Sequence, residues 1–249
     1  MNIQELKDLQ PLVYQQFVTI LEQGRLAHAY LFSGDFASFE MALFLSQALF
    51  CQEKVGVHPC GKCRSCRLIE SNDFSDVTIV APQGNFIKTD TIRELVKNFS
   101  QSGFESSQQV FIIRDAEKMH VNAANSLLKV IEEPQSTIHI FLLTNQEEAV
   151  LPTIKSRTQI ISFPQNLPYL ERILEEEGLL KTQASLIARL VSSQEEAKRL
   201  ATNKSFIDLL DQAKKFTELL LTDSNRAYLQ VGVLVSLAVE KAEQGRLFD

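Results

Sequence analysis

The 249-residue sequence has no long hydrophobic run and no excess of basic residues. Its longest apolar stretches, such as residues 138–143, are far shorter than the roughly 20 residues that a membrane-spanning helix needs. Residues 1–8 contain no apolar core of a signal peptide, so we expect a cytoplasmic protein with no membrane partner. The formal net charge is −6, whereas proteins that bind DNA alone usually carry a positive balance. Strong DNA binding by this chain alone is therefore not expected.

Cysteine is scarce, but the four that occur lie close together, at Cys51, Cys60, Cys63 and Cys66. In a cytoplasmic protein, the spacing C-x8-C-x2-C-x2-C favours metal ligands over disulfides. Four thiolates satisfy tetrahedral Zn²⁺ and leave no open position, so the spacing predicts a structural rather than a catalytic zinc site. An iron–sulfur cluster and four ordinary free cysteines are the alternatives.

Short apolar segments alternate with helical patterns over the first 164 residues. The segments predicted as buried strands are residues 29–33, 77–80, 110–113, 138–143 and 159–163. The segments between them predict crossover helices at residues 39–50, 91–99 and 122–133. Thr91 and Glu94 have the spacing of a capping box, and Pro134 stops the third helix. This alternation predicts a doubly wound α/β domain with a parallel sheet covered on both faces.

The pattern changes after residue 163. Pro164 and Pro168 bracket a predicted linker, and no strand signal follows. The helices predicted beyond it span residues 169–177, 182–191, 194–202, 204–221 and 225–243. We therefore predict three parts: an α/β domain over residues 1–164 with a zinc module at about 51–66, a small three-helix lid domain over 165–203, and a helical C-terminal region over 204–249.

The turn after the first predicted strand is where such a domain would carry a phosphate-binding loop, G-x4-G-K-[ST]. Gly34 fits the first position, but Phe39, Glu40 and Met41 replace the second glycine, the lysine and the hydroxyl. Phe39 blocks close backbone approach, Glu40 repels phosphate, and Met41 cannot bind Mg²⁺. The sequence predicts that ATP does not bind here. A plain strand–turn–helix with one glycine gives the same pattern.

The strand at residues 110–113 continues into Arg114, Asp115 and Ala116, as a Walker B strand would. Asp115 stands where a magnesium-binding acid would lie, and Ala116 replaces the glutamate that often orients water. Because the loop lacks its lysine, we favour the alternative that Asp115 caps a helix.

Several segments together resemble the AAA+ clamp-loader subunits of bacterial DNA polymerase III. Residues 28–34 resemble their opening strand, residues 125–134 their Asn-x-Leu-Leu-Lys and Glu-Glu-Pro segment, and residues 142–145 their sensor 1 strand. A cysteine module inserted after the first helix of the domain is also typical of them. The resemblance covers roughly residues 10–200 and implies a P-loop NTPase-like AAA+ fold. The lost phosphate loop implies a non-motor subunit.

Two further segments resemble nucleotide-sensing motifs of this family. Ser156-Arg157-Thr158 resembles its Ser-Arg-Cys motif, with threonine in place of cysteine. In the family this arginine projects toward ATP held by a neighbouring subunit, so the resemblance implies a catalytic role for Arg157 in trans. The alternative is a surface arginine in a local salt bridge. Residues 192–197 resemble a second sensing stretch, with Glu195 in place of its arginine.

The resemblance implies a subunit that is no enzyme in isolation but works in the clamp loader of a DNA-directed DNA polymerase, a nucleotidyltransferase, during DNA replication. The expected partners are tau/gamma-type ATPase subunits, a delta subunit, and, through the assembly, the sliding clamp and primed DNA. The family's third domain is a larger helical collar, so we expect the residues after Asn203 to form only part of it.

Two other functions are compatible with these residues. The chain could be a P-loop ATPase with an unusual loop. It could also be a zinc-dependent nucleic-acid-binding module, in which Lys62, Arg64 and Arg67 contact phosphates. We favour a solvated surface that offsets the charge of four thiolates, because three cations give little affinity at physiological salt.

Overall fold

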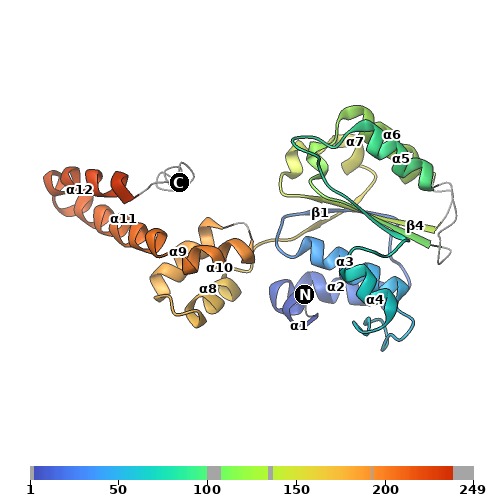
Figure 1. Cartoon of the computed structure of the whole chain (residues 1–249), viewed down its shortest axis with the longest axis horizontal. Coiled ribbons are helices and arrows are strands. Elements are labelled where there is room, and N and C mark those ends of the chain that lie inside the picture. The colour runs from blue at the N-terminus through green and yellow to red at the C-terminus, as the bar shows by residue number, and fades with distance from the viewer. Residues whose placement is uncertain (1–2, 100–107, 134–136, 192, 238–249) are drawn as a thin grey trace. The chain divides into compact units, whose positions relative to one another are not determined.

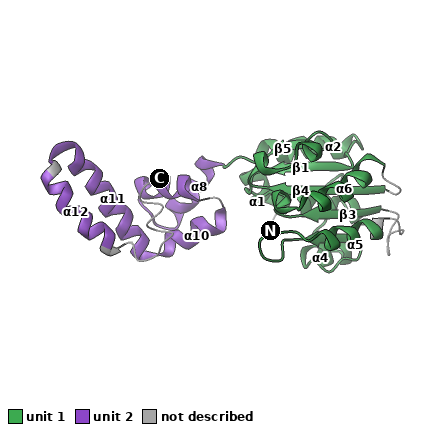
Figure 2. Cartoon of the chain, turned by 90° about the horizontal axis from the view of Figure 1, so that it is seen from above, with its two compact units in different colours: residues 1–165 green, residues 166–249 purple. Residues whose placement is uncertain are grey.

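The computed structural model describes residues 3–99, 108–133, 137–191 and 193–237. The chain forms two compact units, Met1–Gln165 and Asn166–Asp249 (Figure 2). The predicted division of the second unit into a lid domain and a C-terminal region stays a prediction.

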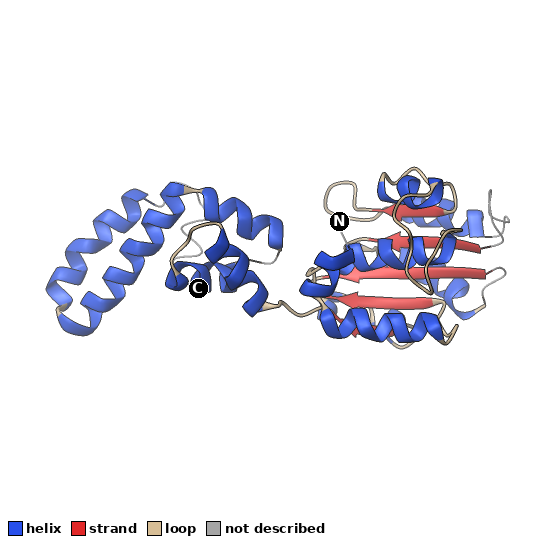
Figure 3. Cartoon of the chain, turned by 90° about the horizontal axis from the view of Figure 1, so that it is seen from below, coloured by secondary structure: helices blue, strands red, loops and turns tan. Residues whose placement is uncertain are grey.

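A five-stranded parallel sheet forms the centre of the first unit (Figure 3). Its strands, in the order β2-β3-β4-β1-β5, place β1 in the interior between β4 and β5. Their bounds are β1 (Ala29–Ser33), β2 (Val77–Val80), β3 (Gln108–Ile113), β4 (Thr137–Thr144) and β5 (Gln159–Ser162). All five predicted strands and their parallel pairing are confirmed, and only the ends of β3, β4 and β5 differ, by one or two residues. The predicted burial of the last strand is wrong, because β5 lies at the edge of the sheet and most of its residues are exposed.

Helices cover both faces of this sheet (Figure 1). One face carries α1 (Ile3–Leu9), α2 (Pro11–Glu22), α3 (Ser38–Phe50) and α4 (Arg64–Glu70), and the other α5 (Thr89–Phe99), α6 (Val121–Glu132) and α7 (Pro152–Lys155). The doubly wound α/β architecture is therefore confirmed. The predicted capping box is wrong, because α5 begins at Thr89 and both Thr91 and Glu94 lie inside the helix.

Alternate residues of the central strands build two separate cores. Tyr30 and Phe32 of β1 are fully buried and pack with Phe17, Phe141 and Phe163, with ring centroids of neighbouring pairs 4.7 to 6.1 Å apart. Leu31, between them, faces the mainly aliphatic core under α5 and α6. A parallel sheet buried on both faces needs such continuous apolar strands, and this is why the sequence showed them as unbroken runs.

The second unit is helical throughout its described residues. Its helices are α8 (Leu167–Glu176), α9 (Lys181–Leu190), α10 (Gln194–Thr202), α11 (Lys204–Thr222) and α12 (Ser224–Leu237). Pro168 does not end a linker as expected but lies in the first turn of α8, where a missing N–H costs nothing. The predicted end of α12 at residue 243 lies outside the described residues. No helix among the described residues is long and apolar enough to span a membrane.

Candidate functional site

The four cysteines converge at one end of α3 and α4. Cys51 directly follows α3, Cys60 and Cys63 lie in the connecting loop, and Cys66 lies in α4. Their four sulfur atoms all lie within 4.8 Å of one another, and the Sγ atoms of Cys51 and Cys63 are 3.9 Å apart. A tetrahedron of sulfurs at about 2.3 Å from Zn²⁺ has edges of about 3.8 Å. The cluster thus fits a tetrahedral ion, and the four residues could hold a metal.

Backbone N–H groups point at two of the sulfurs. The Cys60 N–H donates to Cys51 Sγ at 3.3 Å, and the N–H groups of Lys62 and Cys63 donate to Cys60 Sγ at 3.4 and 3.2 Å. The last two bonds lower the pKa of Cys60 from its ordinary value to about 7. Burial raises the pKa of Cys66, whose residue is fully buried. The loop therefore favours thiolate at its exposed corner, and a cation would have to displace the proton of Cys66.

The cysteine module is bonded to the helices beneath it. Gln47 of α3 donates from Nε2 to the carbonyl oxygen of Cys66 at 2.9 Å. The hydroxyl of Tyr14, on α2, lies 3.0 Å from Nδ1 of His58. Sequence reasoning missed α2 and α4. The signal for α2 was available, since Pro11 opens a segment with apolar residues at the three- and four-residue spacing of a helix.

The turn after β1 is partly buried and packs closely against the backbone of Phe163. Ala37 has a left-handed conformation, with φ of 61°, and Phe36, Ala37 and Ser38 are buried. Gly34 has φ of 113°, and a Cβ atom there would lie 2.3 Å from the carbonyl oxygen of Phe163. The glycine is thus required by close contact with the chain segment that follows β5, whether or not a phosphate binds.

Gln10 ties this turn to the end of the first unit. Its buried side chain donates from Nε2 to the carbonyl oxygen of Phe36 at 2.9 Å and to that of Pro164 at 2.7 Å. A phosphate-binding loop works by pointing N–H groups at its ligand. In this chain the turn instead presents a carbonyl to Gln10. Nothing in the sequence pattern singled out Gln10, because its partners are 26 and 154 residues away.

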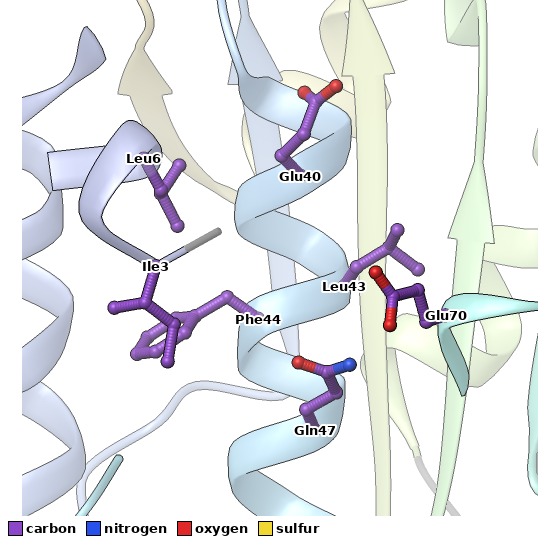
Figure 4. Close-up of a pocket in the computed structure, with 7 residues that line it drawn as sticks. All are labelled: Ile3, Leu6, Glu40, Leu43, Phe44, Gln47 and Glu70. Atoms are coloured by element: carbon purple, nitrogen blue, oxygen red, sulfur yellow. The ribbon is translucent and has the colours of Figure 1, made fainter. Parts of the chain in front are cut away.

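The three substituted positions lie on the first turn of α3. The guanidinium of Arg114 lies over the Phe39 ring, 4.9 Å from its centroid, and Met41 is fully buried in the core. Glu40 and Glu70 line a shallow pocket with an otherwise mainly apolar lining (Figure 4). Glu40 puts a carboxylate on the first turn of α3, where a working loop has a lysine, and this carboxylate repels a triphosphate.

The end of β3 keeps an acid without the arrangement of a magnesium site. Asp115 occupies the N-cap position of the 3₁₀ helix η1 (Ala116–Lys118), but its side chain makes no capping bond. Its carboxylate lies 3.4 Å from the ammonium of Lys118 instead. The prediction that Asp115 caps a helix is therefore right in position but wrong in the hydrogen bond, because the Asp115 side chain does not accept from a backbone N–H of η1. Nearby, the Thr144 hydroxyl donates to Glu117 at 2.6 Å.

In the second unit, the stretch that resembles a nucleotide sensor is a helix start. Ser193 accepts a hydrogen bond from the Glu196 N–H at 3.2 Å and so caps α10. Glu195 lies in the first turn of this helix, where an acid is favourable near the helix N-terminus. The acid at this position thus has a local structural explanation. Ser192 lies outside the described residues.

Arg157 lies in the turn between α7 and β5 and is partly exposed. Its Nε donates to the carboxylate of Glu132, the last residue of α6. Its Nη1 donates to the Thr153 carbonyl oxygen at 3.2 Å and to Ser156 Oγ at 3.1 Å. In the isolated chain, Arg157 therefore forms the salt bridge that the alternative interpretation predicted, with Glu132 as its partner. Sequence reasoning named the arginine but missed Glu132 as its partner.

Comparison with known proteins places the chain in a family. The family model described as "DNA polymerase III, delta subunit" matches residues 9–166. The DNA polymerase III subunit delta' of Bacillus subtilis is 37% identical over 227 residues, which cover 90% of this chain and 69% of that protein. A DNA polymerase III subunit gamma/tau of Mycobacterium tuberculosis is 34% identical over 175 residues, 66% of this chain but only 30% of that protein.

A solved structure supports the fold alone. A variant of RuvB from Thermotoga maritima has a TM-score of 0.50 at 11% identity, with 95% of this chain and 71% of that chain covered. The resemblance to clamp-loader subunits is confirmed by the family and sequence matches, and the P-loop NTPase-like architecture agrees with it. The chain therefore belongs to the DNA polymerase III delta-subunit family, and with it to the AAA+ clamp-loader proteins.

Proposed function

We propose that this chain is a non-motor clamp-loader subunit that binds no nucleotide at its own degenerate loop and supplies Arg157 to ATP held by a neighbouring subunit. The observation that carries the proposal is the charge and backbone direction at the turn after β1. Glu40 occupies the position where a working loop has a lysine. The carbonyl oxygen of Phe36 accepts a hydrogen bond from the Gln10 side chain. Relatives include both delta' and gamma/tau subunits, so the loop chemistry has to decide between the two roles.

The role of Arg157 follows from what a guanidinium does for phosphoryl transfer. Negative charge spreads over the γ-phosphate oxygens in the transition state, and a fixed planar cation stabilises it. The contacts of Arg157 leave its Nη2 group without an acceptor among the described residues. Two N–H donors therefore remain for a nucleotide brought by a neighbour. The ATPase activity would reside in that neighbour.

The cysteine module would hold structural Zn²⁺. Cys51, Cys60, Cys63 and Cys66, whose sulfur atoms all lie within 4.8 Å of one another, would supply all four ligands of a tetrahedral ion and leave no position for water or substrate. The ion would fix the loop between α3 and α4 by joining its four cysteines. Lys62, Arg64 and Arg67 would remain solvated around it and offset its net negative charge.

The partners follow from this role. A tau/gamma-type ATPase subunit would receive Arg157, and a delta subunit, the sliding clamp and primed DNA would join through the assembly. ATP bound by the neighbour would draw the assembly into the form that opens the clamp. Hydrolysis promoted by Arg157 would then release the clamp on DNA during replication.

Arg157→Ala tests this role in a reconstituted loader. An arginine finger contributes roughly 10³ to 10⁵ in rate, so we expect a large loss of clamp- and DNA-stimulated ATP hydrolysis with normal folding and assembly. Arg172→Ala is the matched control, because Arg172 is also a surface arginine in an exposed ion pair. An unchanged rate in Arg157→Ala, with assembly intact, would remove the trans role.

Two measurements on the isolated chain separate the rival functions. Tight, Mg²⁺-dependent ATP binding in a titration would support a P-loop ATPase with an unusual loop. DNA binding with a steep salt dependence would support a zinc-dependent nucleic-acid-binding module. We expect neither, because the turn repels phosphate and the net charge is −6.

A further inference from the structure

The guanidinium of Arg157 is held by three contacts with its own chain. Of its five N–H donors, Nε is taken by Glu132 and Nη1 by the Thr153 carbonyl and the Ser156 hydroxyl. The Thr153 and Ser156 contacts are local, within four residues of Arg157. Glu132 is different, because it reaches the arginine from α6, 25 residues earlier in the chain. These contacts fix the plane of the guanidinium and leave its Nη2 donors without an acceptor among the described residues.

Stability does not explain an acid at position 132. The side chains of Arg157 and Glu132 are 39% and 47% exposed, and exposed ion pairs contribute little to folding. Glu132 is also the last residue of α6, where the negative end of the helix dipole disfavours a carboxylate. A residue that adds little stability in an electrostatically poor position needs another explanation, and its contact with Arg157 supplies one.

We infer that Glu132 is a positioning residue, which orients Arg157 so that its Nη2 donors meet phosphate oxygens of the nucleotide held by a neighbouring subunit. The inference rests on the proposed function of Arg157. An arginine side chain loses much rotamer freedom when it is fixed, and Glu132 fixes it before the neighbour arrives. The acceptor oxygen, rather than the negative charge, does this work, because the charge itself would repel phosphate.

Two variants separate orientation from charge. Glu132→Gln keeps an oxygen that accepts from Nε, whereas Glu132→Ala removes it. Because one of three tethers is lost, we expect Glu132→Ala to lower kcat of the reconstituted loader about threefold to tenfold with KM for ATP unchanged. Glu132→Gln should restore kcat to at least the wild-type value. Glu176→Ala is the matched control, since it removes an exposed glutamate–arginine pair in the second unit.

A second readout uses the full chain alone. The ¹⁵N-labelled Nε–H of Arg157 should give a slowly exchanging signal in the wild type and in Glu132→Gln, and a fast-exchanging one in Glu132→Ala. The two proposals fail differently. An unchanged rate in Arg157→Ala overturns the proposed function and this inference with it. If Arg157→Ala slows ATP hydrolysis but Glu132→Ala keeps the wild-type kcat and the wild-type Nε–H exchange rate, only the role of Glu132 is overturned.

Discussion

Gly34→Ala is predicted to destabilise the first unit because the added methyl group has no space. The Cβ atom would lie 2.3 Å from the Phe163 carbonyl oxygen and 3.0 Å from its carbonyl carbon. Real Cβ contacts do not fall below 3.0 Å, so this backbone would have to move by several tenths of an ångström. The move would strain the hydrogen bond from the Phe163 N–H to the Ser33 carbonyl, 2.6 Å long, which joins the end of β5 to β1.

The size of the effect follows from two contributions. A non-glycine residue at a φ of 113° costs about 1–3 kcal/mol. A weakened backbone hydrogen bond costs a further 0.5–1.5 kcal/mol or so. We therefore expect Gly34→Ala to lower the free energy of unfolding of the first unit by about 2–4 kcal/mol.

Gly24→Ala is the matched control. Gly24 also has a positive φ, of 63°, but an added Cβ would find nothing within 4 Å. This substitution should cost only about 1–2 kcal/mol. The effect of alanine on the unfolded chain is the same in both variants and cancels in the comparison.

Hydrogen exchange in increasing urea, followed by mass spectrometry on peptides from β1 and β5, measures the opening free energy of this unit. If the two glycine variants agree within about 0.5 kcal/mol, an uncertainty typical of such comparisons, the close contact at Gly34 is not what requires the glycine. A larger loss for Gly34→Ala would explain why the first glycine persists in a loop that has lost its other phosphate-binding residues.

Two further outcomes are expected. Metal analysis of the purified protein should find one zinc ion per chain. The Cys66→Ser variant should lose this ion, because a hydroxyl is a poor replacement for a thiolate. Undiminished zinc in Cys66→Ser would contradict the four-cysteine site. Burial lowers the pKa of His139, which lies in β4 with Nδ1 3.0 Å from the Ala27 carbonyl oxygen. As pH falls below the ordinary histidine value of about 6.5, the unfolded chain therefore binds a proton that the folded chain resists. The free energy of unfolding should fall with decreasing pH, by up to about 1.4 kcal/mol per pH unit. The His139→Gln variant should show a smaller dependence on pH in urea titrations from pH 7.5 to 5.5. An equal dependence in both proteins would show that another group titrates.

The cysteine cluster and the Arg157 side chain depend on different parts of the folded chain. The cysteine cluster is held within 16 residues of sequence, and its ligands are brought together by one loop and two helix ends. Arg157 is fixed by a short turn between α7 and β5, and its position depends on the sheet that carries β5. If the cysteines bind a metal, their cluster can form locally, whereas the position of Arg157 requires the folded domain.

The sequence by itself determined the features that arise from neighbouring residues. Unbroken apolar runs predicted the strands, because a strand buried on both faces admits no polar alternation. Cysteine spacing predicted the cluster, because three cysteines within seven residues, preceded by a fourth, are typical of zinc ligands and unusual for ordinary free cysteines. The substitutions at Phe39, Glu40 and Met41 predicted a degenerate loop, since each change removes a group that phosphate or Mg²⁺ requires.

Only the tertiary structure decided the contacts that join distant segments. Gln10 closes the turn after β1 onto the Pro164 carbonyl, and Glu132 of α6 meets Arg157 beside β5. The strand order β2-β3-β4-β1-β5 places Pro164, which follows β5, near the end of β1, and the packing of α7 against α6 brings Arg157 to Glu132. A side chain's hydrogen-bond partner 25 to 154 residues away is set by this order and by packing, neither of which leaves a mark in local residue spacing.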